Sequence, residues 1–190
     1  MKFVVMAGSV RSDRQGIKAA RFVESTLGAR GHDVTLVDPC ELQLPLLDRM
    51  YKEYPKGQAP EVFERLATLY RAVDGFVVVS GEYNHSIPPA LSNLLDHFLE
   101  EYFFRPSAIV CYSAGQFGGV RAAMQLRALL AEVGMPSISS IFPIPSIGKA
   151  FDASGGATDP ALPRRFERFA TEFEWYAAAL REARQHGTPY

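Results

Sequence analysis

Residues 3–16 read FVVMAGSVRSDRQG, and this stretch decides the fold. The apolar run from Phe3 to Ala7 is typical of a strand buried in the middle of a sheet. Gly8 and Ser9 end the run, and residues 14–30 then carry apolar side chains at helical spacing. A strand, a short polar loop and a helix make the first half of a βα unit, so the chain opens as parallel α/β proteins do.

Four further short apolar runs repeat this opening. They predict strands, and the amphipathic stretches between them predict the helices of successive βα units. A long last helix is expected over residues 160–186, whereas residues 39–59 contain several prolines and are expected to be irregular. Right-handed crossovers place helices on both faces of one parallel sheet, which predicts a three-layer α/β sandwich. The predicted strands cover residues 3–7, 34–37, 76–79, 108–112 and 138–142.

Length and composition are those of an ordinary globular domain. The chain has 190 residues, of which 47% are hydrophobic and 22% charged, and we expect one domain over residues 1–190. The net charge of −1 argues against sequence-independent binding of nucleic acid or an anionic membrane. No apolar run reaches the length of a membrane span and no secretory pattern opens the chain, so we expect a cytoplasmic protein. Cys40 and Cys111 are expected to be reduced thiols, and no histidine or cysteine spacing predicts a metal site.

The loop after the first predicted strand carries the residues of an anion site. Ser9, Arg11 and Arg14 can hydrogen-bond to phosphate oxygens, and Gly16 lets the backbone approach a ligand. The unpaired amides of a helix N-terminus also favour an anion. The loop has neither the GxxxxGK[ST] nor the GxGxxG pattern, so it predicts a monophosphate rather than a pyrophosphate. The competing interpretation is a polar turn with solvated arginines.

Two more loops are expected to leave the sheet at the same edge. Residues 81–88, GEYNHSIP, offer a backbone edge and the ring of Tyr83 to a flat ligand; Ser86 could also cap the following helix. Residues 113–121, SAGQFGGVR, contain three glycines whose amides could donate to a ring carbonyl, although a flexible turn has the same composition. The carboxyl ends of parallel strands meet at one edge, so the three loops together predict a site for a planar, singly phosphorylated cofactor such as FMN.

Three signatures make the chain similar to a known family. They are GSxR at 8–11, EYNxSxPxxLxNxxD at 82–96 and SxGxxGGxRAxxQLR at 113–127, and with them the chain resembles the NADPH-dependent FMN reductases. The resemblance implies a flavodoxin-like sandwich, with a five-stranded parallel sheet in the order 2-1-3-4-5, that binds FMN. The FMN contacts that it implies come from Ser9, Arg11, Arg14, Gln15, Gly16, Glu82, Tyr83, Asn84, Ser113, Gly115, Gly118 and Gly119.

The activity implied by the resemblance is that of an NAD(P)H-dependent oxidoreductase. NADPH or NADH passes a hydride to flavin N5, and a small acceptor (quinone, free flavin, azo compound or metal oxyanion) then takes its place and is reduced. No catalytic side chain is required, because the chemistry belongs to the cofactor. The amides of Gly115–Gly119 are expected to stabilise charge on the reduced ring. His85 is expected at the surface rather than in a proton relay. Two other classes stay open: a flavodoxin-like electron carrier, and a flavin-binding regulator without turnover.

The chain departs from the family pattern at two positions. Gly81 stands where many members have proline, which is expected to loosen that wall of the site, and Arg14 stands where many have serine. The resemblance also implies a homodimer or homotetramer. The aromatic run at residues 102–104 is expected to belong to that interface, with the core as the alternative.

Overall fold

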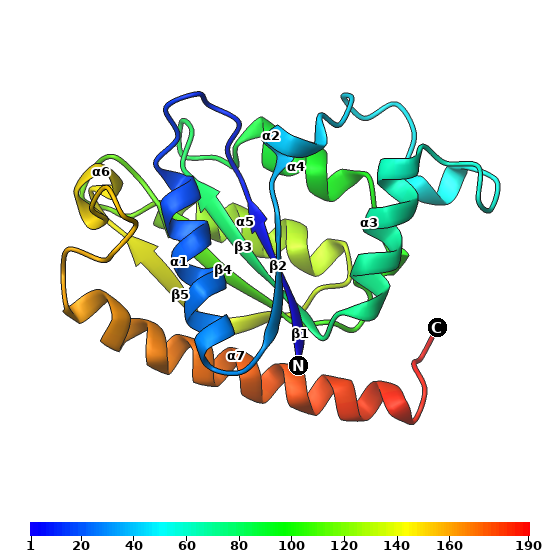
Figure 1. The fold of residues 1–190 in the computed structure, drawn as a ribbon. Coiled ribbons are helices and arrows are strands. Elements are labelled where there is room, and N and C mark those ends of the chain that lie inside the picture. The colour runs from blue at the N-terminus through cyan, green and yellow to red at the C-terminus, as the bar shows by residue number, and fades with distance from the viewer.

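The computed structural model describes residues 1–190 and contains one five-stranded sheet. All strand pairs are parallel, and the strand order β2-β1-β3-β4-β5 confirms the predicted topology. Helices cover both faces of the sheet, so the molecule is the expected three-layer α/β sandwich (Figure 1). The strands are β1 (Lys2–Ala7), β2 (Asp33–Val37), β3 (Gly75–Gly81), β4 (Ser107–Tyr112) and β5 (Ser137–Ile144).

Each face of the sheet has its own set of helices. Helices α1 and α7 pack on one face, and α3, α4 and α5 pack on the other. The short helices α2 and α6 follow β2 and β5. The helices are α1 (Gly16–Ala29), α2 (Pro39–Leu42), α3 (Glu61–Ala72), α4 (Pro89–Asp96), α5 (Val120–Glu132), α6 (Ile147–Ala150) and α7 (Ala161–Gln185), with 3-10 turns at Tyr51–Glu53 and Glu100–Tyr102.

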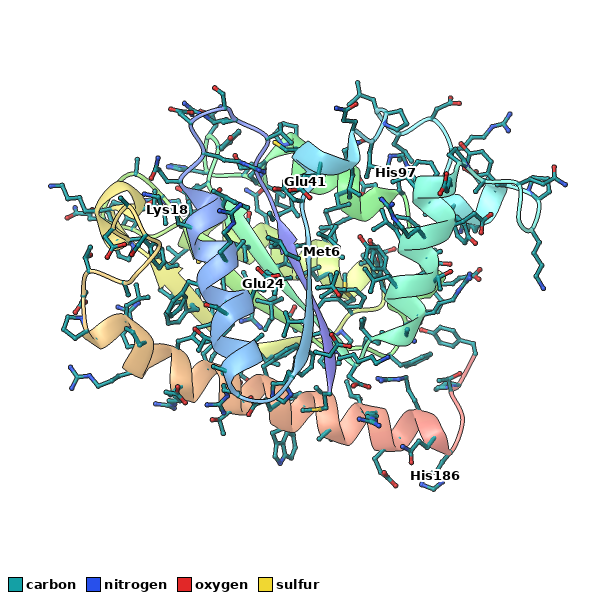
Figure 2. The ribbon with its side chains drawn as sticks, in the orientation of Figure 1. Met6, Lys18, Glu24, Glu41, His97 and His186 are labelled. Carbon is teal, nitrogen blue, oxygen red and sulfur yellow. The ribbon has the colours of Figure 1, made fainter.

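Strand β1 is buried on both faces because its side chains alternate between two apolar cores. Phe3 and Val5 pack with α1 and α7, whereas Val4 and Met6 pack with α3, α4 and α5. All four side chains are fully buried, and Figure 2 shows Met6 in the interior of the molecule. Full burial of one such side chain contributes about 1.5–3 kcal/mol, so β1 firmly anchors the loop that follows it.

Residues 39–59 are more regular than predicted, because α2 and the 3-10 turn at Tyr51–Glu53 lie within them. Asp38 begins α2 by accepting a hydrogen bond from the N–H of Cys40 at 3.0 Å. Pro39 then occupies the first helical position, where its fixed φ suits a helix. A helix of four residues is too short to leave a periodic pattern, which is why the sequence did not predict it.

The aromatic run at residues 102–104 is not the exposed patch that an interface needs. Tyr102 is fully buried and belongs to the core, so the interface prediction is wrong for this residue. Phe103 and Phe104 are half-buried and pack on Tyr190, with ring centroids 5.3 and 4.9 Å from the tyrosine ring. These contacts bring the end of the chain to the amino end of β4.

The strand order creates a crevice at the carboxyl edge of the sheet. The chain leaves β1 toward β2 on one side, whereas β3 and β4 continue toward the other. Ligands of open α/β sheets bind where the connections diverge in this way. The loops that follow β1, β3 and β4 lie together at this edge, at the top of Figure 1. None of the helices has the length and apolarity needed to cross a membrane.

Candidate functional site

A cleft of about 260 Å³ lies at the carboxyl edge of the sheet, and we call it the carboxyl-edge cleft. Its walls come from the loops that follow β1, β3 and β4 and from the start of α6. The three loops that the sequence singled out therefore meet at one place. The lining residues are Ser9, Arg11, Asp13, Arg14, Gln15, Gly81, Glu82, Tyr83, Tyr112, Ser113, Ala114 and Ile147.

The first loop presents unpaired donors at the start of α1. The N–H of Gly8 donates to the Val79 carbonyl oxygen at 2.9 Å, which fixes the loop to the sheet. No side chain caps α1, and the backbone N–H groups of residues 15–17 have no acceptor in the protein. Arg11 beside them is exposed, and its Nε lies 3.2 Å from Asp13 Oδ1. Free amides, a helix N-terminus and a cation at one point are the features that favour a bound anion.

Arg14 is held differently from Arg11. Its guanidinium makes a two-point ion pair with buried Asp38, with Nη2 2.6 Å from Oδ2, and Nη1 also donates to the Ser9 carbonyl oxygen at 2.9 Å. The hydrogen bond to Asp38 raises the pKa of Arg14, so this cation is permanent. Arg14 thus joins the first loop to the start of α2, and the charge of Asp38 largely offsets its own.

The second loop ends in a tight turn over residues 83–86. Tyr83 and Ser86 exchange backbone hydrogen bonds of 3.0 and 2.9 Å. Asn84 and His85 between them both have left-handed backbones, with φ of 51° and 64°. The tip of this turn is exposed, which agrees with a surface position for His85. Ser86 does not cap α4; its hydroxyl donates to Gln125 Oε1 at 2.7 Å instead.

Side chains fasten the second loop to α5, the helix that follows the third loop. Glu82 Oε2 accepts hydrogen bonds from the N–H groups of Arg121 (3.1 Å) and Ala122 (3.4 Å), at the first turn of α5. Gln125 Nε2 donates to the His85 carbonyl oxygen at 2.9 Å. Glu82 therefore serves as the missing N-cap of α5, and a carboxylate is favoured at this end of a helix. The two walls of the cleft are in this way held as one unit.

The third loop is a run of unpaired amides. None of the backbone N–H groups from residue 114 to residue 119 has an acceptor in the protein. Gly118 and Gly119 have left-handed backbones, with φ of 64° and 81°. A side chain at position 119 would place its Cβ 2.6 Å from the Tyr112 carbonyl oxygen, so this turn requires glycine. Such a loop can stabilise negative charge that develops on a bound ring.

Tyr112, the last residue of β4, fills the floor of the cleft. An ideal Cβ built on Gly16 would lie 2.1 Å from its Oη, and one built on Gly81 would lie 3.1 Å from the same atom. The ring therefore occupies the space that side chains at positions 16 and 81 would need. The sequence suggested that Gly81 loosens this wall; in the structure the ring of Tyr112 fills the space beside Gly81.

The structure brings seven of the twelve predicted site residues into the walls of the cleft. Gly16, Asn84, Gly115, Gly118 and Gly119 shape the loops without lining it. The sequence reasoning missed Tyr112 and Ile147, among others. Tyr112 directly precedes Ser113 at the end of a predicted strand, which was a usable signal, whereas nothing marked Ile147 in a loop of irregular composition. The seven predicted residues that line the cleft are Ser9, Arg11, Arg14, Gln15, Glu82, Tyr83 and Ser113.

Comparison with known proteins assigns the chain to a family. The sequence model of a family described as NADPH-dependent FMN reductase matches residues 1–149. The chain belongs to this family. Membership confirms the predicted class, an NAD(P)H-dependent oxidoreductase that works with FMN. The match ends before α7, yet Phe166, Phe169 and Phe173 of that helix are part of the core.

Individual relatives share about 30% of their residues with this chain. A quinone reductase of Pseudomonas putida is 30% identical over 179 residues, which cover 88% of this chain and 91% of the relative. An NADPH azoreductase of a Bacillus species is 28% identical over 134 residues, which cover 70% of each chain.

Solved structures confirm the flavodoxin-like fold. FerB, an NAD(P)H:(acceptor) oxidoreductase of Paracoccus denitrificans, superposes with a TM-score of 0.70 at 22% identity, and the match covers 95% of this chain and 97% of FerB. A flavodoxin of Pseudomonas aeruginosa superposes with a TM-score of 0.55 at 21% identity, covering 95% of this chain and 99% of the flavodoxin.

Proposed function

We propose that the protein holds FMN in the carboxyl-edge cleft and uses NADPH or NADH to reduce a small acceptor, with a quinone as the preferred class. The observation that carries this proposal is that two groups of backbone N–H without acceptors lie on one cleft. One group is at the start of α1 and the other is at residues 114–119. The first group suits a phosphate and the second suits an electron-rich ring. Quinone reductases among the relatives support the choice of acceptor.

The residues present fit a singly phosphorylated ligand. The N–H groups of residues 15–17 and the hydroxyl of Ser9 are donors, and Arg11 supplies a cation. Exposed ion pairs contribute about 0–1 kcal/mol, so Arg11 can exchange its surface partner Asp13 for a phosphate at little cost. Arg14 faces the same cleft, but its ion pair with Asp38 gives it the role of holding the loop.

In the proposed reaction the protein binds, orients and stabilises charge. Bound FMN would supply the redox chemistry, which is the transfer of a hydride from the nicotinamide and of two electrons to the acceptor. The amides of residues 114–119 would stabilise negative charge on the bound ring. The hydrogen bonds of Glu82 and Gln125 join the wall that bears Tyr83 to α5, so this wall and the amides keep a fixed spacing. No protein nucleophile takes part, and donor and acceptor use one site in turn.

The test begins with an absorbance spectrum of the purified protein, before and after added FMN. Anaerobic NADPH, and then NADH in a separate sample, should bleach the visible flavin band within the mixing time of a manual experiment. A protein that neither carries nor takes up flavin would refute the proposal. Bleaching by a partner reductase alone would make it an electron carrier. Stoichiometric flavin without steady-state turnover on quinones, free FMN or ferricyanide would make it a regulator.

Arg11→Ala should lose most of the affinity for FMN. A hydrogen bond to a charged group is worth about 1.5–3 kcal/mol, which corresponds to a weakening of roughly tenfold or more. Fluorescence titration measures the dissociation constant. Arg21→Ala is the matched control, because Arg21 is exposed on α1 and makes no side-chain hydrogen bond or ion pair. Unchanged flavin occupancy in Arg11→Ala would remove Arg11 from the phosphate site.

We also propose that the protein assembles as a homodimer or homotetramer and works in the cytoplasm. Phe117 precedes α5 and Met124 lies on it, and about half of each side chain is exposed. These two apolar side chains could form part of an interface. Light scattering after gel filtration measures the mass in solution, and a monomer at micromolar concentration would contradict the assembly.

A further inference from the structure

Tyr112 is a buried residue whose hydroxyl lies at the carboxyl-edge cleft. The residue is 8% exposed, and its ring packs against the core formed with α1 and α7. The residue lines the carboxyl-edge cleft, and the hydroxyl of Ser9 is the one side chain that hydrogen-bonds to its Oη. Ser9 also lies 3.4 Å from the hydroxyl of Tyr83, so the three hydroxyls form one group in the cleft. A hydrogen bond from Ser9 to Tyr112 Oη leaves the phenol's own O–H free to donate, and at the wall of a cleft that O–H can donate to a ligand.

The position of the Tyr112 hydroxyl indicates which part of a ligand it can contact. An ideal Cβ on Gly16, the first residue of α1, would lie 2.1 Å from Tyr112 Oη. The hydroxyl is therefore beside the first turn of α1, where the N–H groups of residues 15–17 have no acceptor. The helix N-terminus and the hydroxyl form one cluster of donors, and such a cluster suits an anionic oxygen.

The hydroxyl is a donor throughout the physiological pH range. Burial raises the pKa of Tyr112 to about 12, because it disfavours the phenolate, and Ser9 and the two arginines of the first loop offset this in part. A protonated phenol beside an anion donates a charge-assisted hydrogen bond, which is stronger than one between neutral groups.

We propose that Tyr112 is a binding residue for the phosphate of FMN, and that its hydroxyl helps the protein to select FMN over riboflavin. This inference rests on the proposed function and adds to it a determinant of cofactor selectivity. It also gives a reason for glycine at both position 16 and position 81, since the ring reaches the phosphate end of the cleft only where both side chains are absent.

Tyr112→Phe tests the inference, because it removes the hydroxyl and keeps the ring between Gly16 and Gly81. Dissociation constants for FMN and for riboflavin are measured by fluorescence titration on wild type and variant. We expect the affinity for FMN to fall about tenfold or more and the affinity for riboflavin to change by less than about twofold. Circular dichroism and the melting temperature check that the variant is folded.

Tyr70→Phe is the matched control, since Tyr70 is a buried tyrosine too, but it packs in the core on the other face of the sheet, away from the cleft. It should leave both dissociation constants unchanged. A second arm uses inorganic phosphate alone, which should raise the melting temperature of wild type more than that of Tyr112→Phe.

Three outcomes would overturn the inference. Equal losses for FMN and riboflavin would give Tyr112 a role in the ring site or in packing alone. Unchanged FMN affinity in Tyr112→Phe would exclude the phosphate contact while leaving the proposed function intact. A wild-type protein that binds no flavin would instead refute the proposed function. This result is obtained without any variant, so it can be distinguished from failure of the inference about Tyr112.

Discussion

Two glycines of α1 differ in the space that surrounds them, so substitution by alanine should have opposite effects on stability. Gly16 faces Tyr112, so Gly16→Ala would force the ring aside and destabilise the protein by about 1–3 kcal/mol through overpacking. Gly28 has no atom within 4 Å of its ideal Cβ, so Gly28→Ala should stabilise the helix by about 0.5–1 kcal/mol. Urea denaturation measures both changes. Shifts of the same sign would contradict this account of Gly16.

At the scale of single residues, the sequence predicted where the site lies better than what each side chain does. The loops after β1, β3 and β4 were found from glycines and from polar residues that follow apolar runs. The partners of Arg14 and Glu82 could not be found in this way, because Asp38 and the amides at the start of α5 lie 24 and 39 residues away along the chain. From the sequence alone, Arg14 beside the start of a helix indicates an anion site. Only the fold shows that its guanidinium is already paired with the carboxylate of Asp38.

Among the elements, α1 and α7 are joined by Glu174. Its carboxylate accepts hydrogen bonds from Arg30 Nε (2.6 Å) and Nη2 (2.7 Å), and Oε1 lies 2.8 Å from His32 Nε2. The hydrogen bond from Arg30 is the largest cause that lowers the pKa of Glu174 below its ordinary value of 4.5. The charged form is therefore favoured in the folded protein, and this stabilisation is present above pH 4.5 and is lost as the pH falls through the lowered pKa.

Glu174→Gln should accordingly reduce the free energy of unfolding at pH 7 by up to about 1 kcal/mol, since the site is partly exposed to solvent. The difference from wild type should shrink as the pH is lowered from 5 to 3. Chemical denaturation at several pH values measures it. Glu24→Gln on α1 is the matched control, because Glu24 (labelled in Figure 2) makes no ion pair or side-chain hydrogen bond. A difference that stays constant with pH would contradict this role of Glu174.

The strands and long helices were predictable because their apolar residues repeat with a period. Buried runs of five or six residues and helices of three or more turns leave a pattern that few other structures share. The short helices α2 and α6 leave no such pattern, and so residues 39–59 and the loop after β5 could not be described in advance. Ile147, which lines the cleft, belongs to α6 in one of these segments. The role of His97 was not predictable either. It is buried between α3 and α4 and packs against Phe63, and no sequence motif indicates this packing (Figure 2).

For the whole molecule, the two cores share one sheet, so the predicted single domain should unfold in one transition. Bound FMN should move this transition upward, because a ligand of the native state stabilises it by about 2.7 kcal/mol at 100 times the dissociation constant. For a chain of this size that corresponds to roughly 5–10 °C. Scanning calorimetry with FMN and with riboflavin measures the shift. No shift at saturating FMN, or two separate transitions, would contradict the prediction.

The order of the strands was the part of the whole fold that the family resemblance supplied. Apolar runs alone limited the topologies to a few, and the order 2-1-3-4-5 placed the crevice between the connections of β1 and β3. Residues beyond the family match also matter at this scale. Helix α7 covers one face of the sheet, and its phenylalanines were predicted from their helical spacing.

Both ends of the chain lie at the opposite edge of the sheet from the cleft. Met1 precedes β1, and its carbonyl accepts a hydrogen bond from Asp33 at the start of β2, while Tyr190 packs on Phe103 and Phe104 ahead of β4. Figure 1 shows both termini below the sheet and the β1–α1 loop above it. An affinity tag, a fused protein or a tether to an electrode can thus be attached at either terminus and leave the mouth of the cleft open. An immobilised sample would then turn its electron-transfer face toward the solution.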